Sequence, residues 1–172
     1  MREIGVAVIG TRFMGRAHAN AWRQVRAFFP PLLLPRLVVA CGRDEARLTE
    51  FARRFGFEHA VADWREAIAH DDVGLVDISC SNDLHAEIAS AAASEGKAML
   101  CEKPLARDLG EAKGMLQAVE EAGVPHMVCF NYRFFPAIRL AKELIQDGAL
   151  GEIRQYHALY LQDWGLDPGL PL

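Results

Sequence analysis

Two short stretches of the sequence hold residues that could do chemistry. The first is Gly10-Thr11-Arg12-Phe13-Met14-Gly15, which follows the apolar run 4–9 and precedes a helix-compatible segment. Glycines at this spacing let a loop wrap the pyrophosphate of a dinucleotide and aim a helix N-terminus at it. The pattern therefore predicts a dinucleotide-binding turn. Arg12 stands at the place of the usual middle glycine, where it either contacts the phosphate or displaces it.

The second stretch is Cys101-Glu102-Lys103-Pro104, at the end of another apolar run. Charged residues at a strand end that faces a ligand crevice are seldom buried unless they are paired or used. Lys103 at this strand end can hold a substrate hydroxyl and assist proton transfer during hydride movement. The alternative is a solvated pair of Glu102 and Lys103 before a proline turn.

Other candidate binding residues follow two more apolar runs. Ser79 and Asn82 come after the run 75–78, and His85 either faces the same crevice or is only a first-turn helix residue. Gly42 stands where NAD enzymes place an acidic residue on the ribose 2′-hydroxyl, and Arg43 lies beside it. A small residue next to a guanidinium favours NADP over NAD, unless Arg43 is merely a solvated loop residue.

Apolar runs and helical patterns alternate along the chain. The predicted strands are 4–9, 37–41, 60–61, 75–78, 98–100 and 127–130, and the predicted helices are 15–28, 44–55, 64–69, 84–95 and 108–122. Six strands joined by helices predict an α/β fold with a doubly wound parallel sheet, the Rossmann fold. In such a sheet the strand ends meet at one edge, which would bring the candidate residues together.

Two apolar segments lie outside this alternation. Phe28–Pro35 contains three prolines, so we expect an apolar loop that packs on the domain. Residues 152–163 alternate in polarity and are predicted to form a long strand with one covered face. We therefore expect an NAD(P)-binding domain at 1–125. Residues 126–172 would hold its last strand, a connecting helix and the first strand of an incomplete α+β domain for substrate binding and oligomerisation.

Composition excludes several classes of protein. The 172 residues are 51% hydrophobic and 24% charged with a net charge of -4, without a basic stripe, so nucleic acid is not an expected partner. Neither a membrane-spanning run nor a signal-peptide layout is present, which predicts a cytoplasmic protein without membrane contact. The four cysteines lack C-x-x-C spacing, so we expect reduced, mostly buried thiols and no metal.

Four segments, in order, resemble the Gfo/Idh/MocA family, named for glucose-fructose oxidoreductase and inositol dehydrogenase. They are Gly10–Asn20, Asp77–Ile88, Glu102–Pro104 and Asn131–Arg133. The resemblance implies an NAD(P)-dependent dehydrogenase that moves hydride between nicotinamide and a sugar, polyol or cyclitol carbon, and a homo-oligomer. Family members are about twice this long. The resemblance thus implies that the catalytic C-terminal half is absent and that this chain alone turns over little.

The resemblance also implies individual roles. Lys103 would be the catalytic residue at the reacting hydroxyl, and Glu102 would lie near the nicotinamide. The resemblance places Phe13 and Met14 under the pyrophosphate, Ser79 and Asn82 near the nicotinamide ribose, and Tyr132 and Arg133 at the substrate cleft with His85 nearby. Together with the residues of the glycine turn and of the second strand end, the expected cofactor contacts are Gly10, Arg12, Phe13, Met14, Gly15, Gly42, Arg43, Ser79, Asn82, His85, Glu102 and Lys103. Arg12 and Ser81 depart from the family's usual glycine and proline. The rival hypothesis is a non-catalytic dinucleotide-binding module or redox sensor, which has no need of the Glu102–Lys103 pair.

Overall fold

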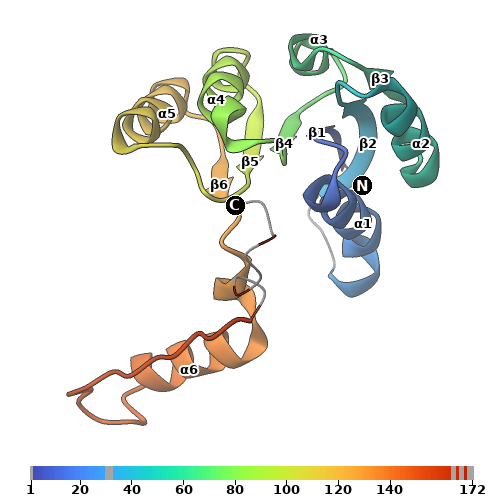
Figure 1. Cartoon of the computed structure of the whole chain (residues 1–172). Helices are drawn as coiled ribbons and strands as arrows, with labels where there is room; N and C mark the ends of the chain where they lie inside the picture. The colour runs from blue at the N-terminus through green and yellow to red at the C-terminus, as the bar shows by residue number, and fades with distance from the viewer. Residues whose placement is uncertain (1, 30–32, 164–165, 167–168, 170–172) are drawn as a thin grey trace. The chain divides into compact units, whose positions relative to one another are not determined.

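The computed structural model describes residues 2–29, 33–163, 166 and 169 (Figure 1). The chain divides into two compact units, residues 1–130 and residues 131–172. All six strands of the described residues belong to the first unit. This unit extends five residues beyond the expected boundary at 125 because β6 (His126–Val128) pairs with β5 (Ala98–Cys101).

The first unit is built on one parallel sheet with the strand order β3-β2-β1-β4-β5-β6. The remaining strands are β1 (Arg2–Ile9), β2 (Leu33–Cys41), β3 (His59–Val61) and β4 (Leu75–Ile78). This order is that of a doubly wound Rossmann sheet, and it confirms the predicted fold. The direction of winding reverses between β1 and β4, which leaves a crevice at the carboxyl ends of these two strands.

Helices cover both faces of the sheet. They are α1 (Phe13–Phe28), α2 (Glu45–Phe55), α3 (Trp64–Ala69), α4 (His85–Ser94) and α5 (Leu109–Ala122). The core cluster under α1 and α2 contains Val6, Val8, Ala19, Leu48, Phe51 and Phe55. The cluster under α3, α4 and α5 contains Ala7, Ile9, Ile68, Ile88, Met115 and Val119. Because successive side chains of a strand point to opposite faces, β1 contributes alternate residues to the two clusters.

Three helices begin at an aspartate whose side chain accepts a backbone N–H hydrogen bond. Asp44, Asp63 and Asp108 cap α2, α3 and α5 in this way. In contrast, α1 begins at Arg12, whose side chain makes no capping hydrogen bond, and its first turn holds no acidic residue. The N-terminus of α1 is therefore the one among these four that is left open to an outside anion. In the described part of the chain no helix is long and apolar enough to cross a bilayer.

The segment before β2 differs from the expectation. β2 begins at Leu33 rather than Leu37 and includes Pro35, which pairs with Ile4 of β1. Proline is tolerated because β3 pairs with β2 only from Val39 onward, so β2 is an edge strand at Pro35. Phe28 and Phe29 are 71% and 65% exposed, so the predicted packed loop is wrong at these positions. Residues 30–32 of that prediction lie outside the described residues.

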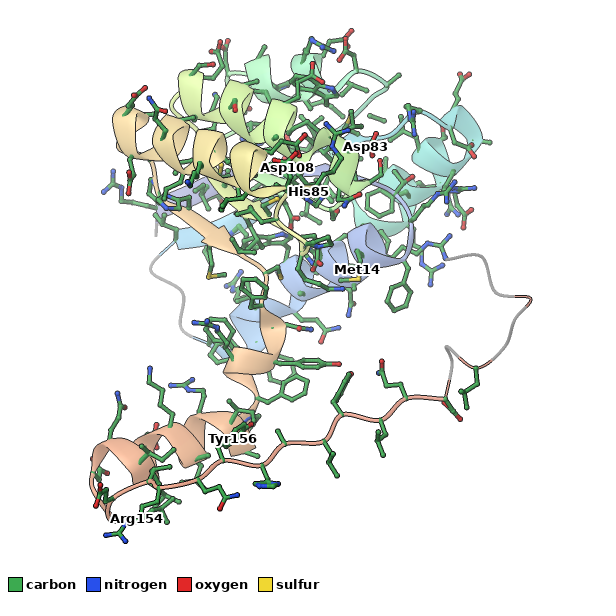
Figure 2. All side chains as sticks on the ribbon, turned by 60° about the vertical axis from the view of Figure 1, so that its left-hand side comes forward. Met14, Asp83, His85, Asp108, Arg154 and Tyr156 are labelled. Atoms are coloured by element: carbon green, nitrogen blue, oxygen red, sulfur yellow. The ribbon has the colours of Figure 1, made fainter. Side chains whose placement is uncertain are left out.

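The second unit contains the 3₁₀ turn η2 (Asn131–Phe134), helix α6 (Pro136–Gln146) and an extended segment that runs alongside α6 (Figures 1 and 2). The strand predicted at 152–163 is wrong, since these residues take no strand structure. A strand exists only when it pairs, and no strand of the described residues pairs with this segment. Alternating polarity alone could not supply that partner.

Gly15 gives a direct test of how tightly α1 approaches β1. A Cβ atom at Gly15 would lie 1.8 Å from the backbone oxygen of Gly10, whereas one at Gly114, inside α5, would meet nothing within 4 Å. Gly15→Ala is expected to lower the free energy of unfolding by about 1–3 kcal/mol through overpacking. Gly114→Ala should raise it by about 0.5–1 kcal/mol through helix propensity. Urea unfolding of both variants checks this, and equal changes would refute the close approach.

Candidate functional site

A cavity of about 640 Å³ lies at the carboxyl ends of β1, β2 and β4, where the sheet winding reverses. Its volume falls within the range of small-molecule and cofactor sites. The residues around it are Ile9, Gly10, Thr11, Arg12, Phe13, Met14, Cys41, Gly42, Arg43, Asp44, Arg47, Ala62, Trp64, Ser79, Cys80, Ser81 and Leu84. Segments far apart in sequence thus meet where a doubly wound sheet binds its ligand.

The turn between β1 and α1 is shaped by its two glycines. Gly10 has a φ of +124°, and a Cβ atom there would lie 2.5 Å from the backbone oxygen of Ser79. The approach of Gly10 to Ser79 places the turn against the end of β4, and a Cβ atom at Gly15 would lie even closer, 1.8 Å, to the backbone oxygen of Gly10. Any side chain at either glycine would push the turn away from the sheet and displace the N-terminus of α1.

That N-terminus opens directly into the cavity. Arg12 and Phe13 are exposed, and Met14 on the first turn is half-buried (Figure 2). The free backbone N–H groups and the helix dipole favour an anion, and Arg12 adds a full positive charge. These residues fit the pyrophosphate of a dinucleotide.

The end of β2 explains why an acidic residue is missing at position 42. A Cβ atom on Gly42 would lie 2.7 Å from Cγ2 of Thr11, whose side chain is buried. Asp44, the nearest acidic residue, accepts the backbone N–H of Arg47 at 3.0 Å and pairs with its guanidinium at 3.2 Å. This part of the cavity rim carries exposed Arg43, whose charge also acts on the exposed carboxylate of Asp83.

The structure brings together only some of the predicted site residues. Those around the cavity are Gly10, Arg12, Phe13, Met14, Gly42, Arg43 and Ser79, and Gly15 lies immediately behind them. Asn82, in the 3₁₀ turn η1 (Asn82–Leu84), Glu102 and Lys103 do not line it. Lys103 is exposed at the end of β5. Direct contact of these three residues with a cofactor stays a prediction.

His85 is buried to 1% exposure at the start of α4 (Figure 2). Its Nδ1 lies 3.1 Å from the backbone oxygen of Pro104 and its Nε2 lies 3.3 Å from that of Cys80. The ring thus connects the loop after β4 with the loop after β5. This burial favours a positioning role over the predicted contact with a cofactor.

The predicted substrate residues Tyr132 and Arg133 belong to η2 in the second unit. The Tyr132 hydroxyl forms a 2.8 Å hydrogen bond with that of Tyr160, and its ring packs against Phe135 at a tilt of 41° with 4.8 Å between centroids. The Tyr132 hydrogen bond raises the pKa of Tyr160. Contact of either predicted residue with a substrate stays a prediction.

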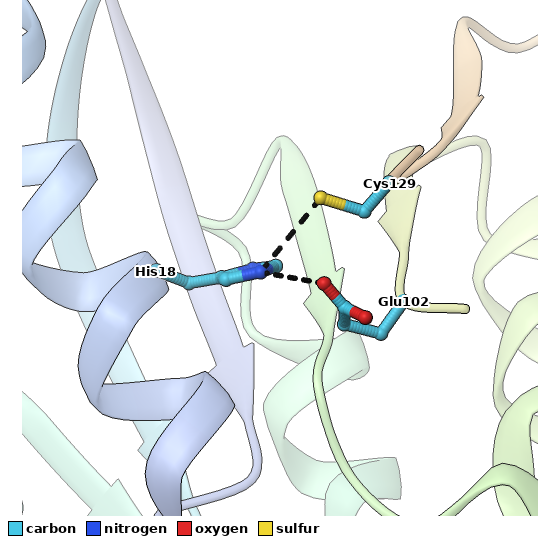
Figure 3. Close-up of side chains that lie close together, drawn as sticks. All are labelled: His18, Glu102 and Cys129. Atoms are coloured by element: carbon cyan, nitrogen blue, oxygen red, sulfur yellow. Dashed lines mark hydrogen bonds and ion pairs between the residues drawn. The ribbon is translucent and has the colours of Figure 1, made fainter. Parts of the chain in front are cut away.

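Sequence reasoning missed a buried polar network beneath this edge of the sheet. Asp77, in the middle of β4, has no exposed surface. Its carboxylate lies 2.8 Å and 3.0 Å from Nδ1 of His18 and accepts Nε1–H of Trp22 at 2.6 Å. On the other side of the ring, His18 Nε2 lies 3.1 Å from Oε1 of Glu102 and 3.8 Å from Sγ of Cys129 (Figure 3).

Two carboxylates set the ionisation of this network. Burial lowers the pKa of His18, but hydrogen bonds and charge from Asp77 and Glu102 together raise that pKa above its ordinary value. Burial and the charge of Glu102 raise the pKa of the Cys129 thiol to about 11, so it is neutral at neutral pH. The other three cysteines are also free thiols, with a pKa raised by burial to about 11 or 12.

The sequence did contain a signal for this network. An aspartate inside the apolar run Leu75–Ile78 must find a partner, because a buried, unpaired charge costs several kcal/mol. Gly15, His18, Ala19 and Trp22 repeat at helical spacing and form the sheet-facing side of α1. Together these features could have pointed to His18 and Trp22 as the partners, although not to Glu102.

Comparisons with known proteins agree with this geometry. Residues 4–130 match the GFO_IDH_MocA family model, described as an oxidoreductase family with an NAD-binding Rossmann fold. Levoglucosan dehydrogenase of Pseudarthrobacter phenanthrenivorans is 48% identical over 174 residues, which cover 100% of this chain and 44% of that enzyme. A solved structure of levoglucosan dehydrogenase with NADH superposes with a TM-score of 0.92 at 46% identity, covering 99% of this chain and 46% of that one.

A more distant relative is D-xylose 1-dehydrogenase (NADP(+)) 2 of Haloferax volcanii. It is 35% identical over 134 residues, which cover 74% of this chain and 41% of that enzyme. The chain therefore spans less than half the length of these relatives. The levoglucosan dehydrogenase structure is a complex with NADH, whereas the D-xylose dehydrogenase is named for NADP⁺.

The network makes Asp77 a sensitive position for stability. Asp77→Asn removes one charge of a buried pair and leaves His18 facing an amide, so we expect a loss of about 3–5 kcal/mol in the free energy of unfolding. Asp71→Asn, at an exposed aspartate, should change it by less than about 0.5 kcal/mol. Urea unfolding of both variants measures the difference.

The stability difference between the wild type and Asp77→Asn depends on pH, in a direction set by the raised pKa of His18. The raised pKa of His18 stabilises the folded chain fully below the unfolded pKa of about 6.5, and the effect is lost as pH rises through the folded pKa. The gap between the wild type and Asp77→Asn should therefore shrink as pH rises from about 6 to about 9. A gap that widens over this interval would contradict the assignment.

Proposed function

The chain belongs to the Gfo/Idh/MocA oxidoreductase family, as its motifs predicted, and we propose a function from this premise. The chain is the cofactor-binding part of a nicotinamide-dependent dehydrogenase that acts on a hydroxyl group of a sugar or polyol. The observation that carries the proposal is the cavity at the β1–α1 turn, with an uncapped helix N-terminus and two glycines that admit no side chain. A dinucleotide is the ligand that this combination suits best.

The binding of the cofactor follows from residues around the cavity. Gly10 lets the turn approach the ligand, while the first backbone N–H groups of α1 and the guanidinium of Arg12 hold the pyrophosphate. The apolar sides of Phe13 and Met14 flank the same position. Bound there, the nicotinamide supplies the hydride donor or acceptor, and the protein supplies orientation and charge.

We propose NADP as the preferred form. Gly42 and Thr11 leave no room for an acidic side chain at the ribose, and the carboxylate of Asp44 is held by Arg47. Arg43 is exposed on the cavity rim, where a guanidinium can form two parallel hydrogen bonds with a 2′-phosphate. Both cofactors occur among the relatives, so the preference rests on these side chains.

Lys103 is the residue proposed to contact the substrate. Its backbone N–H donates to Oε2 of Glu102 at 3.0 Å, which fixes the backbone while the side chain extends to solvent. An exposed ammonium group at a strand end can bind the reacting hydroxyl and take part in proton transfer. Sugars are the proposed substrates because the names of the relatives at 48% and 35% identity are those of sugar dehydrogenases.

The four free thiols fit a reducing compartment such as the cytoplasm, which we propose as the location. Homo-oligomer formation stays a prediction from the family resemblance.

Thermal unfolding with NAD⁺, NADP⁺ and no ligand tests the cofactor site. A ligand that binds only the folded chain, at about 100 times its Kd, adds about 2.7 kcal/mol. We expect both dinucleotides to raise Tm and NADP⁺ to do so at lower concentration. A Tm that does not change with either dinucleotide would contradict the proposed function.

Matched variants separate the 2′-phosphate contact from general charge. Arg43→Ala should weaken NADP⁺ binding about 10- to 100-fold and leave NAD⁺ binding nearly unchanged, because a hydrogen bond to a charged group contributes about 1.5–3 kcal/mol. Arg53→Ala removes the same charge from the exposed last turn of α2, away from the cavity residues. Equal losses for both variants would rule out a specific contact by Arg43.

A further inference from the structure

We infer that His18 is a positioning residue, which bridges Asp77 and Glu102 and through Glu102 holds the backbone of Lys103 at the carboxyl edge of the sheet. The inference deepens the proposed function and rests on it, since Lys103 matters only where the chain serves a dehydrogenase. His18 itself lies buried behind Glu102, so it acts through that residue.

The first contact of the bridge fixes the ring. Nδ1 of His18 lies within 3.0 Å of both carboxylate oxygens of Asp77, and Oδ2 of Asp77 also accepts Nε1–H of Trp22. His18 and Trp22 lie one turn apart on α1, so two hydrogen bonds attach the helix to the centre of β4. The imidazole plane is thereby held in one orientation.

The second contact joins the fixed ring of His18 to Lys103 through the side chain of Glu102. Oε1 of Glu102 lies 3.1 Å from Nε2 of His18, and Oε2 accepts the backbone N–H of Lys103 at 3.0 Å. Glu102 is only 4% exposed, so water does not replace either partner. Figure 3 shows the side of this contact that joins His18 to Glu102. A carboxylate with both oxygens engaged has one favourable orientation, and the peptide of Lys103 is fixed with it.

The bridge requires a proton on each ring nitrogen. Both nitrogens face carboxyl groups, which in their ionised form only accept hydrogen bonds, so with Asp77 and Glu102 both ionised the imidazolium is the form that satisfies both sides. The titratable groups that face the ring are Asp77 from β4, Glu102 after β5 and Cys129 after β6. When the ring loses a proton, one buried carboxylate loses its donor, and the support of Lys103 is weakened.

A metal ion is the competing explanation. The ligand atoms of His18, Glu102 and Cys129 lie within 4.8 Å of one another, and Asp77 behind the histidine resembles the outer partner of a zinc ligand. However, each hydrogen bond in the network is complete without an ion. Both ring nitrogens of His18 and both carboxylate oxygens of Glu102 already have a hydrogen-bond partner. The observations therefore favour the protonated bridge.

NMR of the full ¹⁵N-labelled chain, without cofactor and with EDTA, tests the inference. Two signals are followed from about pH 5 to about pH 9: the ring nitrogens of His18 and the backbone amide of Lys103. We expect both ring nitrogens to be protonated at pH 7 and to titrate above the ordinary value of about 6.5. The Lys103 amide should shift with the same midpoint.

A variant pair shows whether the link runs through His18. In His18→Gln a neutral amide replaces the ring, so the Lys103 amide should lose its titration step. His126→Gln removes an exposed histidine at the amino end of β6, the opposite edge of the sheet, and should leave the step unchanged. If His18→Gln does not fold, the wild-type titration alone shows whether the Lys103 amide and the His18 ring titrate with the same midpoint.

Three results would overturn the inference. They are a His18 midpoint at or below about 6.5, a Lys103 amide that does not follow it, and loss of the Nε2 proton at pH 7 when one equivalent of Zn²⁺ replaces EDTA. If the chain shows both titrations but binds no dinucleotide, the proposed function is refuted and the link from His18 to Lys103 stands. If the chain binds a dinucleotide but the two signals do not titrate together, only the link from His18 to Lys103 is refuted.

Discussion

A carboxylate buried in the middle of the parallel sheet is the constraint on which the rest of the site depends. Asp77 has no exposed surface, and an unpaired charge there would cost several kcal/mol. Its partners His18 and Trp22 both come from α1, so neutralising Asp77 also fixes that helix against β4. The helix that aims its N-terminus at the cavity is therefore attached, one turn further on, to the strand across the crevice.

The close packing of the glycine turn and the buried network act on the same helix from two sides. Gly15 brings α1 against β1, and three residues later His18 faces Asp77 and Glu102. Through Glu102 the contact reaches the loop after β5, where Lys103 extends to solvent. The cofactor cavity and the proposed substrate lysine thus share one support, although they lie on different strands.

Local patterns in the sequence were sufficient to predict the sheet, its helices and the glycine turn. Those features depend on periodicity and on backbone conformations that only glycine allows. The start of β2 at Leu33 and the unpaired segment 152–163 depend on neighbours distant in sequence, and both differed from the expectation. The partners of Asp77 were missed for the same reason: an aspartate in an apolar strand shows that partners exist, but only the fold selects them.

The central claim is that a dinucleotide binds at the β1–α1 turn, and mapping the backbone amide shifts caused by NADPH in the labelled chain tests it most directly. The account predicts shifts concentrated at Gly10, Met14, Gly42 and Ser79, which come from three different strand ends around one cavity. The amides of Gly114 and Gly123, on α5 and at its end, should not move. Shifts that are absent from the turn, or that centre on α5, would contradict the account.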